Sequence, residues 1–128
     1  MSEINALAVA VAALATFVIG GPWYRVFGER WNREMGVGTK TPGHPAKVFG
    51  LAYVFSLISA GLLAAYLGSD VDAATGLKTG ALVGACFVAA SFGVNYLFAN
   101  RSFAALAIDG GYHILQFAAF GLILGLWP

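Results

Sequence analysis

The chain has 128 residues, of which 59% are hydrophobic and only 10% are charged, and its formal net charge is +1. Soluble domains carry about 25% charged residues, so this composition excludes a protein whose whole surface faces water. The mean hydropathy of +0.79 indicates lipid as the solvent instead. The low net charge, without a dense run of Lys and Arg, gives no indication of a nucleic-acid partner.

Four apolar runs of membrane-spanning length divide the chain. A helix needs about 20 mainly apolar residues to cross the hydrocarbon core, where an isolated strand cannot satisfy its backbone. The sequence therefore predicts an all-α, integral membrane four-helix bundle that forms one transmembrane domain over residues 1–128. The expected spans are residues 4–21, 48–67, 77–98 and 103–127.

The first run also has the length of a signal peptide. Its beginning, "MSEINALAVA", has no Lys or Arg before the apolar stretch, and no small-x-small cleavage site precedes a mature domain. We therefore expect residues 4–21 to be retained as the first span.

An amphipathic segment follows the first span. Gly20, Gly21 and Pro22 are expected to interrupt the first helix, and Pro is favourable at the first position of a new one. The aromatic face of "PWYRVFGERWNREMG" then predicts a short cytoplasmic helix of residues 22–36 in the lipid headgroup plane, with a gate over a cavity as the alternative. The expected interfacial anchors are Trp23, Tyr24, Phe27, Trp31 and, at the end of the last span, Trp127.

Basic residues are distributed unequally between the two sides of the expected membrane. One side has six of them, namely Arg25, Arg30, Arg33, Lys40, Lys47 and Arg101. The other side has only Lys78. Because cytoplasmic loops carry an excess of Lys and Arg, we predict a multi-pass membrane protein with both termini outside the cytoplasm.

Small residues recur at four-residue steps in the last two spans. They are Gly76, Gly80 and Gly84 in the third span, and Gly121 and Gly125 in the fourth. This spacing lets helix backbones approach closely, although glycine is also simply common in spanning helices. The sequence leaves open whether the partner lies in the same chain. We expect a homo-oligomer or another membrane-protein partner within the lipid bilayer, since four short helices seldom enclose a pathway alone.

A polar stripe runs along one face of the fourth span. It consists of Asp109, Tyr112, His113 and Gln116. A charged residue deep in lipid costs about 2.5–3.5 kcal/mol on insertion scales, so the stripe should face the bundle interior or a subunit interface. Ser91 and Asn95 lie at about the same depth in the third span. Together these residues predict a polar seam between the two helices.

Three interpretations of the stripe compete. Asp109 and His113 either fix helix register in a non-catalytic scaffold or accessory subunit, or form a protonatable site of a small transport or permeation protein. The third interpretation, metal or haem ligation by His113, lacks an evident second ligand, because His44 lies in a distant loop. No catalytic signature is present, so we expect neither an enzyme, a cofactor nor a metal site. The small molecule or ion that would be transported is not indicated.

Three stretches carry a resemblance to a known family. They are "GPWYRVFGERWNREMG", "HPAKVFGLAYVFSLISAGLLA" and "NYLFANRSFAALAIDGGYHILQFAAFGLILGLW". In order and spacing they resemble a family of small bacterial integral membrane proteins catalogued only as a domain of unknown function. The resemblance covers nearly the whole chain and implies a four-span protein of the bacterial inner membrane. It implies no activity, substrate or catalytic residue.

Overall fold

The computed structural model of this protein describes residues 4–36 and 43–128. Within these ranges the chain is helical and contains no strand. The elements are α1 (Ala6–Met35), α2 (Pro45–Leu67), α3 (Ala73–Val83), the π-helix η1 (Gly84–Ala89), α4 (Ala90–Phe98) and α5 (Phe103–Leu126). Because α3, η1 and α4 are continuous, the described chain forms four long helices, each apolar and long enough to cross a membrane. The predicted all-α, four-helix architecture is confirmed.

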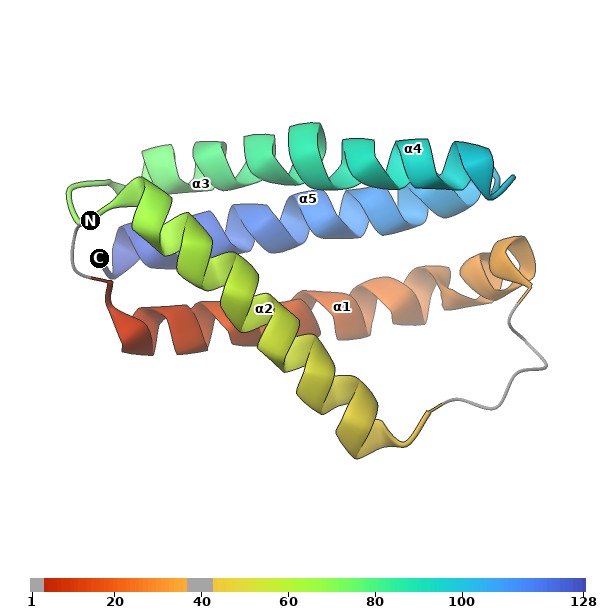
Figure 1. The fold of residues 1–128 in the computed structure, drawn as a ribbon, viewed down its shortest axis with the longest axis horizontal. Coiled ribbons are helices and arrows are strands. Elements are labelled where there is room, and N and C mark those ends of the chain that lie inside the picture. Colours follow the sequence, from red (N-terminus) through yellow and green to blue (C-terminus); the bar gives the residue numbers. More distant parts are fainter. Residues whose placement is uncertain (1–3, 37–42) are drawn as a thin grey trace.

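α5 is the central helix of the bundle. Figure 1 shows α1 along one side of α5 and the continuous rod of α3, η1 and α4 along the other. α2 crosses the bundle obliquely, and its amino-terminal end diverges from the other helices. The two ends of the chain lie together, where the Asn5 amide donates to the Trp127 carbonyl oxygen at 3.4 Å.

Side-chain caps determine where three of the helices begin. Asn5 accepts a hydrogen bond from the amide of Ala8, Asp72 from the amide of Thr75, and Ser102 from the amide of Ala105. Asn, Asp and Ser are favourable at this position because their side-chain oxygens satisfy amide groups that have no partner inside the helix. The hydrogen bonds with Thr75 also lower the pKa of the exposed Asp72 carboxyl group.

The predicted interruption of the first helix at Gly20, Gly21 and Pro22 is wrong. α1 is a single helix of 30 residues with Pro22 inside it. Two hydrogen bonds hold α1 against α5 on either side of Pro22: the Tyr112 hydroxyl donates to the carbonyl oxygen of Thr16, and the Trp23 indole to that of Ile108, both at 2.9 Å. Contacts with a neighbouring helix therefore hold α1 in place before and after Pro22.

α3 and α5 approach each other closely at their glycines. A Cβ atom at Gly76 or Gly80 would overlap the backbone of α5, and one at Gly84 would lie 2.8 Å from the carbonyl oxygen of His113. Gly121 and Gly125 face α3 in the same way. The partner of the third-span glycines is thus α5 of the same chain, and these glycines no longer support an interface between subunits.

The π-helix η1 changes which residues of α4 face α5. In an uninterrupted α-helix, the residue eleven positions after Gly84, which is Asn95, would lie on the same face as Gly84. A π-turn accommodates one additional residue. Consequently Tyr96 is buried against α5, whereas Ser91 and Asn95 are exposed.

Substituting a contact glycine should destabilise the bundle. We expect Gly80→Ala to lower the free energy of unfolding by about 1–3 kcal/mol, because the new methyl group meets backbone rather than a movable side chain. Gly50→Ala in α2, where a Cβ atom meets nothing within 4 Å, is the matched control. Thermal unfolding in one detergent measures both, and equal midpoints would contradict the close packing of α3 against α5.

Candidate functional site

Asp109 is buried at one end of the bundle and accepts three side-chain hydrogen bonds. Its side chain is only 5% exposed. Oδ1 accepts from the Tyr24 hydroxyl at 2.5 Å, and Oδ2 accepts from the Trp31 indole at 3.0 Å and from the Tyr96 hydroxyl. All three donors are neutral aromatic residues, and in the described part of the chain no Lys, Arg or His forms a salt bridge with this carboxyl group.

The continuity of α1 brings Tyr24 and Trp31 to the same carboxyl group. Trp31 comes seven positions after Tyr24, which is close to two helical turns, so both lie on one face. Side chains on a helix point towards its amino-terminus, and the Trp31 indole therefore reaches back to the level of Asp109.

Trp23, Tyr24 and Trp31, which were predicted as headgroup anchors, form hydrogen bonds with α5. Trp23 binds the α5 backbone, and the ring of Phe27 lies 4.7 Å from that of Trp23. Gly111 makes room for the indole, since a Cβ atom there would lie 3.0 Å from Trp23. The face of α1 that carries Trp23, Tyr24 and Trp31 packs against α5, and the anchoring role of these residues and of Phe27 stays a prediction. Trp127 is exposed at the other end, and its role as an anchor stays a prediction.

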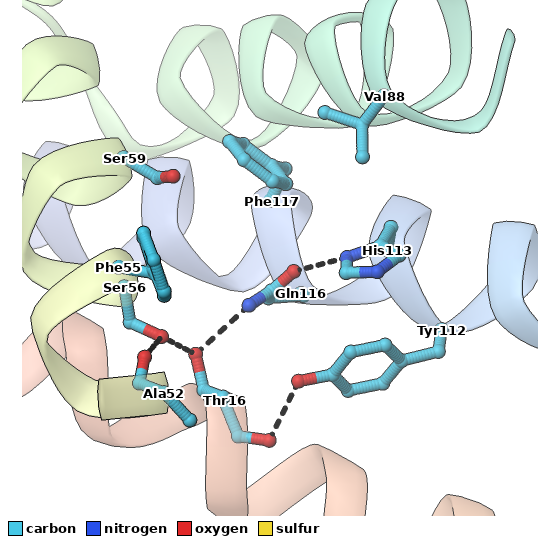
Figure 2. Close-up of a pocket in the computed structure, with 10 residues that line it drawn as sticks. All are labelled: Thr16, Ala52, Phe55, Ser56, Ser59, Val88, Tyr112, His113, Gln116 and Phe117. Atoms are coloured by element: carbon cyan, nitrogen blue, oxygen red, sulfur yellow. Dashed lines mark hydrogen bonds between the residues drawn. The ribbon is translucent and has the colours of Figure 1, made fainter. Parts of the chain in front are cut away.

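A second hydrogen-bond network joins α5, α1 and α2 near mid-span. His113 Nδ1 lies 2.6 Å from Gln116 Oε1, and Gln116 Nε2 donates to Thr16 Oγ1 at 2.8 Å. Thr16 Oγ1 lies 2.6 Å from Ser56 Oγ, and Ser56 in turn donates to the carbonyl oxygen of Ala52 at 2.8 Å. Figure 2 shows this succession of contacts across the three helices.

The donors in this network form a directed chain. Ser56 has one hydroxyl proton and gives it to Ala52, so Thr16 donates to Ser56 and accepts from Gln116. The Gln116 amide therefore presents its oxygen to His113, and Nδ1 of His113 donates to that oxygen. In the neutral imidazole, Nε2 is then an acceptor without a proton.

This chain lines a pocket of about 390 Å³. Ten residues from four elements surround it, namely Thr16, Ala52, Phe55, Ser56, Ser59, Val88, Tyr112, His113, Gln116 and Phe117 (Figure 2). Phe55 is 66% exposed, so the pocket opens on the lateral surface of the bundle between α2 and η1. Gln116 lies about 20 Å along α5 from Phe103 and about 15 Å from Leu126, which places the pocket near mid-span.

Aromatic rings hold the imidazole of His113 while one ring nitrogen stays free. The ring stacks on Phe92 at a centroid distance of 4.9 Å and meets the edge of Tyr112 at 4.8 Å. Every buried side-chain nitrogen or oxygen of the described residues has a hydrogen-bond partner. Nε2 of His113 has no hydrogen-bond partner, so it is not one of these buried atoms. It is therefore an accessible acceptor.

The predicted polar seam separates into three parts. Asp109 belongs to the aromatic network, whereas Tyr112, His113 and Gln116 line the pocket. Ser91 and Asn95 lie elsewhere, on an exposed groove of α4. The described residues contain no group of three His, Cys, Asp or Glu side chains that could hold a metal ion.

Several residues of the site were missed in the sequence. They are Thr16, Tyr24, Trp31, Ser56 and Tyr96, of which Tyr24 and Trp31 were assigned to the membrane surface. Thr16 had a usable signal, because it is the one side chain between Ala6 and Gly21 with a hydrogen-bonding group. A lone hydroxyl in an apolar span indicates a polar partner on another helix.

The Asp109 network should stabilise the fold. Asp109→Asn replaces one acceptor oxygen by an NH₂ group. If the NH₂ group takes the place of Oδ2, Trp31 and Tyr96 lose their acceptor, and if it takes the place of Oδ1, Tyr24 loses its acceptor. We expect a loss of about 1–3 kcal/mol in unfolding free energy, as for other buried donors left unpaired. Asp70→Asn, in the exposed turn after α2, is the control. An Asp109→Asn protein that unfolds at the wild-type denaturant concentration would refute this role.

Comparisons with known proteins agree with the architecture. The model of a family described as a protein of unknown function (DUF1761) matches residues 7–125. No curated protein and no solved structure matches the chain. The match extends from the first turn of α1 to the last turn of α5 and includes both hydrogen-bond networks. This four-helix protein therefore belongs to the DUF1761 family of proteins of unknown function.

Proposed function

We propose that this protein is a small transport protein of the bacterial inner membrane, whose working site is the pocket beside His113. One observation carries the proposal. The pocket reaches an imidazole near mid-span whose Nε2 atom is accessible and has no partner in the described chain. Histidine side chains change charge near neutral pH, and ionisable residues inside membranes often mark ion or proton paths.

The hydrogen-bond chain makes His113 suited to reversible protonation. Nδ1 donates to Gln116 in the neutral ring, and it still donates to Gln116 when Nε2 also carries a proton. Protonation at Nε2 therefore leaves the links to Thr16 and Ser56 unchanged. Only the Nε2 edge of the ring changes its hydrogen-bonding character, from acceptor to donor, when the ring gains its charge.

A scaffold is the second candidate function, and the Asp109 network favours it. That carboxyl group has three donors from α1 and α4 and is buried, which is the arrangement of a residue that fixes helix positions. The two functions differ at His113, because a scaffold does not require an accessible imidazole in a pocket.

The orientation in the membrane and the assembly of subunits belong to the same proposal. The excess of Arg and Lys in the last part of α1, in the segment after it and at the start of α2 supports a cytoplasmic location for these ends of the two helices and an outside location for both termini. Assembly into a homo-oligomer, or with another membrane protein, is supported by the small size of the bundle, because four short helices seldom enclose a pathway alone.

Proton-coupled flux should depend on His113. In proteoliposomes with an internal pH-sensitive dye, we expect the wild-type protein to dissipate a pH gradient and His113→Gln to lose most of that rate. Gln retains a polar side chain but does not titrate near neutral pH. Asn95→Ala, in the groove along η1 and α4 that is not lined by His113, should keep the wild-type rate. A His113→Gln protein that is less stable yet dissipates the gradient at the wild-type rate would leave only the scaffold.

Cysteine labelling in intact cells tests the orientation. In a Cys86→Ser background, which removes the native exposed thiol, we expect Asp70→Cys to react with a membrane-impermeant maleimide. Asn100→Cys, in the exposed turn between α4 and α5, should react only after the cells are opened. The opposite pattern would place both termini in the cytoplasm.

A further inference from the structure

We propose that the pocket beside His113 binds an uncharged amphiphile, with an apolar body and a hydroxyl group that donates a hydrogen bond to Nε2 of His113. This inference rests on the proposed function and names the class of ligand.

The unpartnered groups of the pocket select a hydrogen-bond donor. The chain from His113 to Ala52 occupies the hydroxyl groups of Thr16 and Ser56. The Tyr112 hydroxyl donates to the Thr16 carbonyl oxygen. Nε2 of His113 is left as an acceptor, and the Ser59 hydroxyl on the opposite wall has no side-chain partner among the hydrogen bonds of the described residues. A ligand hydroxyl satisfies Nε2 as a donor.

The lining excludes a permanent ion as the preferred ligand. None of the ten lining residues is Asp, Glu, Lys or Arg. Transfer of an ion into such a site costs far more than its hydrogen bonds return unless an opposite charge is present. A neutral hydroxyl needs only the single acceptor that is available.

The position of the opening selects an apolar body. The mouth of the pocket lies near mid-span on the lateral surface, beside the exposed ring of Phe55. In a bilayer this surface faces hydrocarbon, so a ligand enters from the membrane rather than from water. Phe55, Val88 and Phe117 provide apolar walls for its body. The volume of about 390 Å³ is within the range of small-molecule sites.

A matched pair of probes tests the donor requirement. Para-hexylphenol and para-hexylanisole share their apolar body, but only the phenol can donate a hydrogen bond. The full-length protein, labelled with ¹⁵N-histidine and held in nanodiscs, reports binding directly, because the chain has only two histidines. The probes are compared at equal mole fractions in the lipid. His44, exposed at the start of α2, is the internal control.

We expect the phenol to shift the Nε2 resonance of His113 saturably and to leave that of His44 unchanged. The ether should need a concentration roughly five- to tenfold higher for half-saturation, which corresponds to one net hydrogen bond. Val88→Trp, which fills the pocket, should abolish both responses. Leu62→Trp, on a 73% exposed position of α2 away from the pocket, should leave them unchanged.

The outcomes distinguish this inference from the proposed function. If the phenol and the ether reach half-saturation at the same concentration, and both responses are lost in Val88→Trp, the donor requirement is overturned. The pocket would then still be a ligand site. No saturable response to either probe, with pH-gradient dissipation still dependent on His113, would overturn the amphiphile and retain transport. If dissipation is also independent of His113, the proposed function fails as well.

Discussion

Polar side chains in an apolar bundle must find hydrogen-bond partners on other helices, because hydrocarbon offers none. α5 carries the polar stripe of this protein, and its neighbours are arranged around that requirement. Asp109 draws donors from α1 and α4. Gln116 reaches Thr16 on α1, which in turn reaches Ser56 on α2. Each of the other long helices thus has a polar link to α5, directly or through α1.

The two networks differ in how completely they are satisfied. Around Asp109, rigid aromatic donors close the site and no polar atom is left over. Around His113, the chain of donors ends at the imidazole of a residue that lines a pocket, and Nε2 of this ring has no partner in the described chain. A single polar stripe in the sequence therefore contributes to two networks. The network around Asp109 is fully satisfied and holds helices together, whereas the network around His113 has a free acceptor that can bind a ligand. The proposal of transport depends only on the second.

Composition and the lengths of the apolar runs predicted the four helices, because a hydrocarbon core imposes a length on any helix that crosses it. The spacing of the glycines predicted a close approach, although not its partner. Other features depend on three-dimensional contacts that no local pattern contains. Pro22 was taken as a break, but hydrogen bonds to α5 hold the helix on both sides of it. Thr16 and Gln116 are 100 positions apart in the chain and meet only after α1 and α5 have packed.

Asn95 was predicted to face α5 in place of Tyr96, and the cause is the π-helix η1. Its additional residue has a consequence for chain length within the family. Gly84 and Tyr96 are twelve positions apart, and a relative with one residue fewer between them would have a step of eleven. Eleven residues of α-helix complete close to three turns, so that relative would form an uninterrupted helix. That relative would still present both residues to α5. A single-residue insertion or deletion can therefore be accommodated in this stretch, with the glycine contacts before it and the tyrosine contact after it both retained.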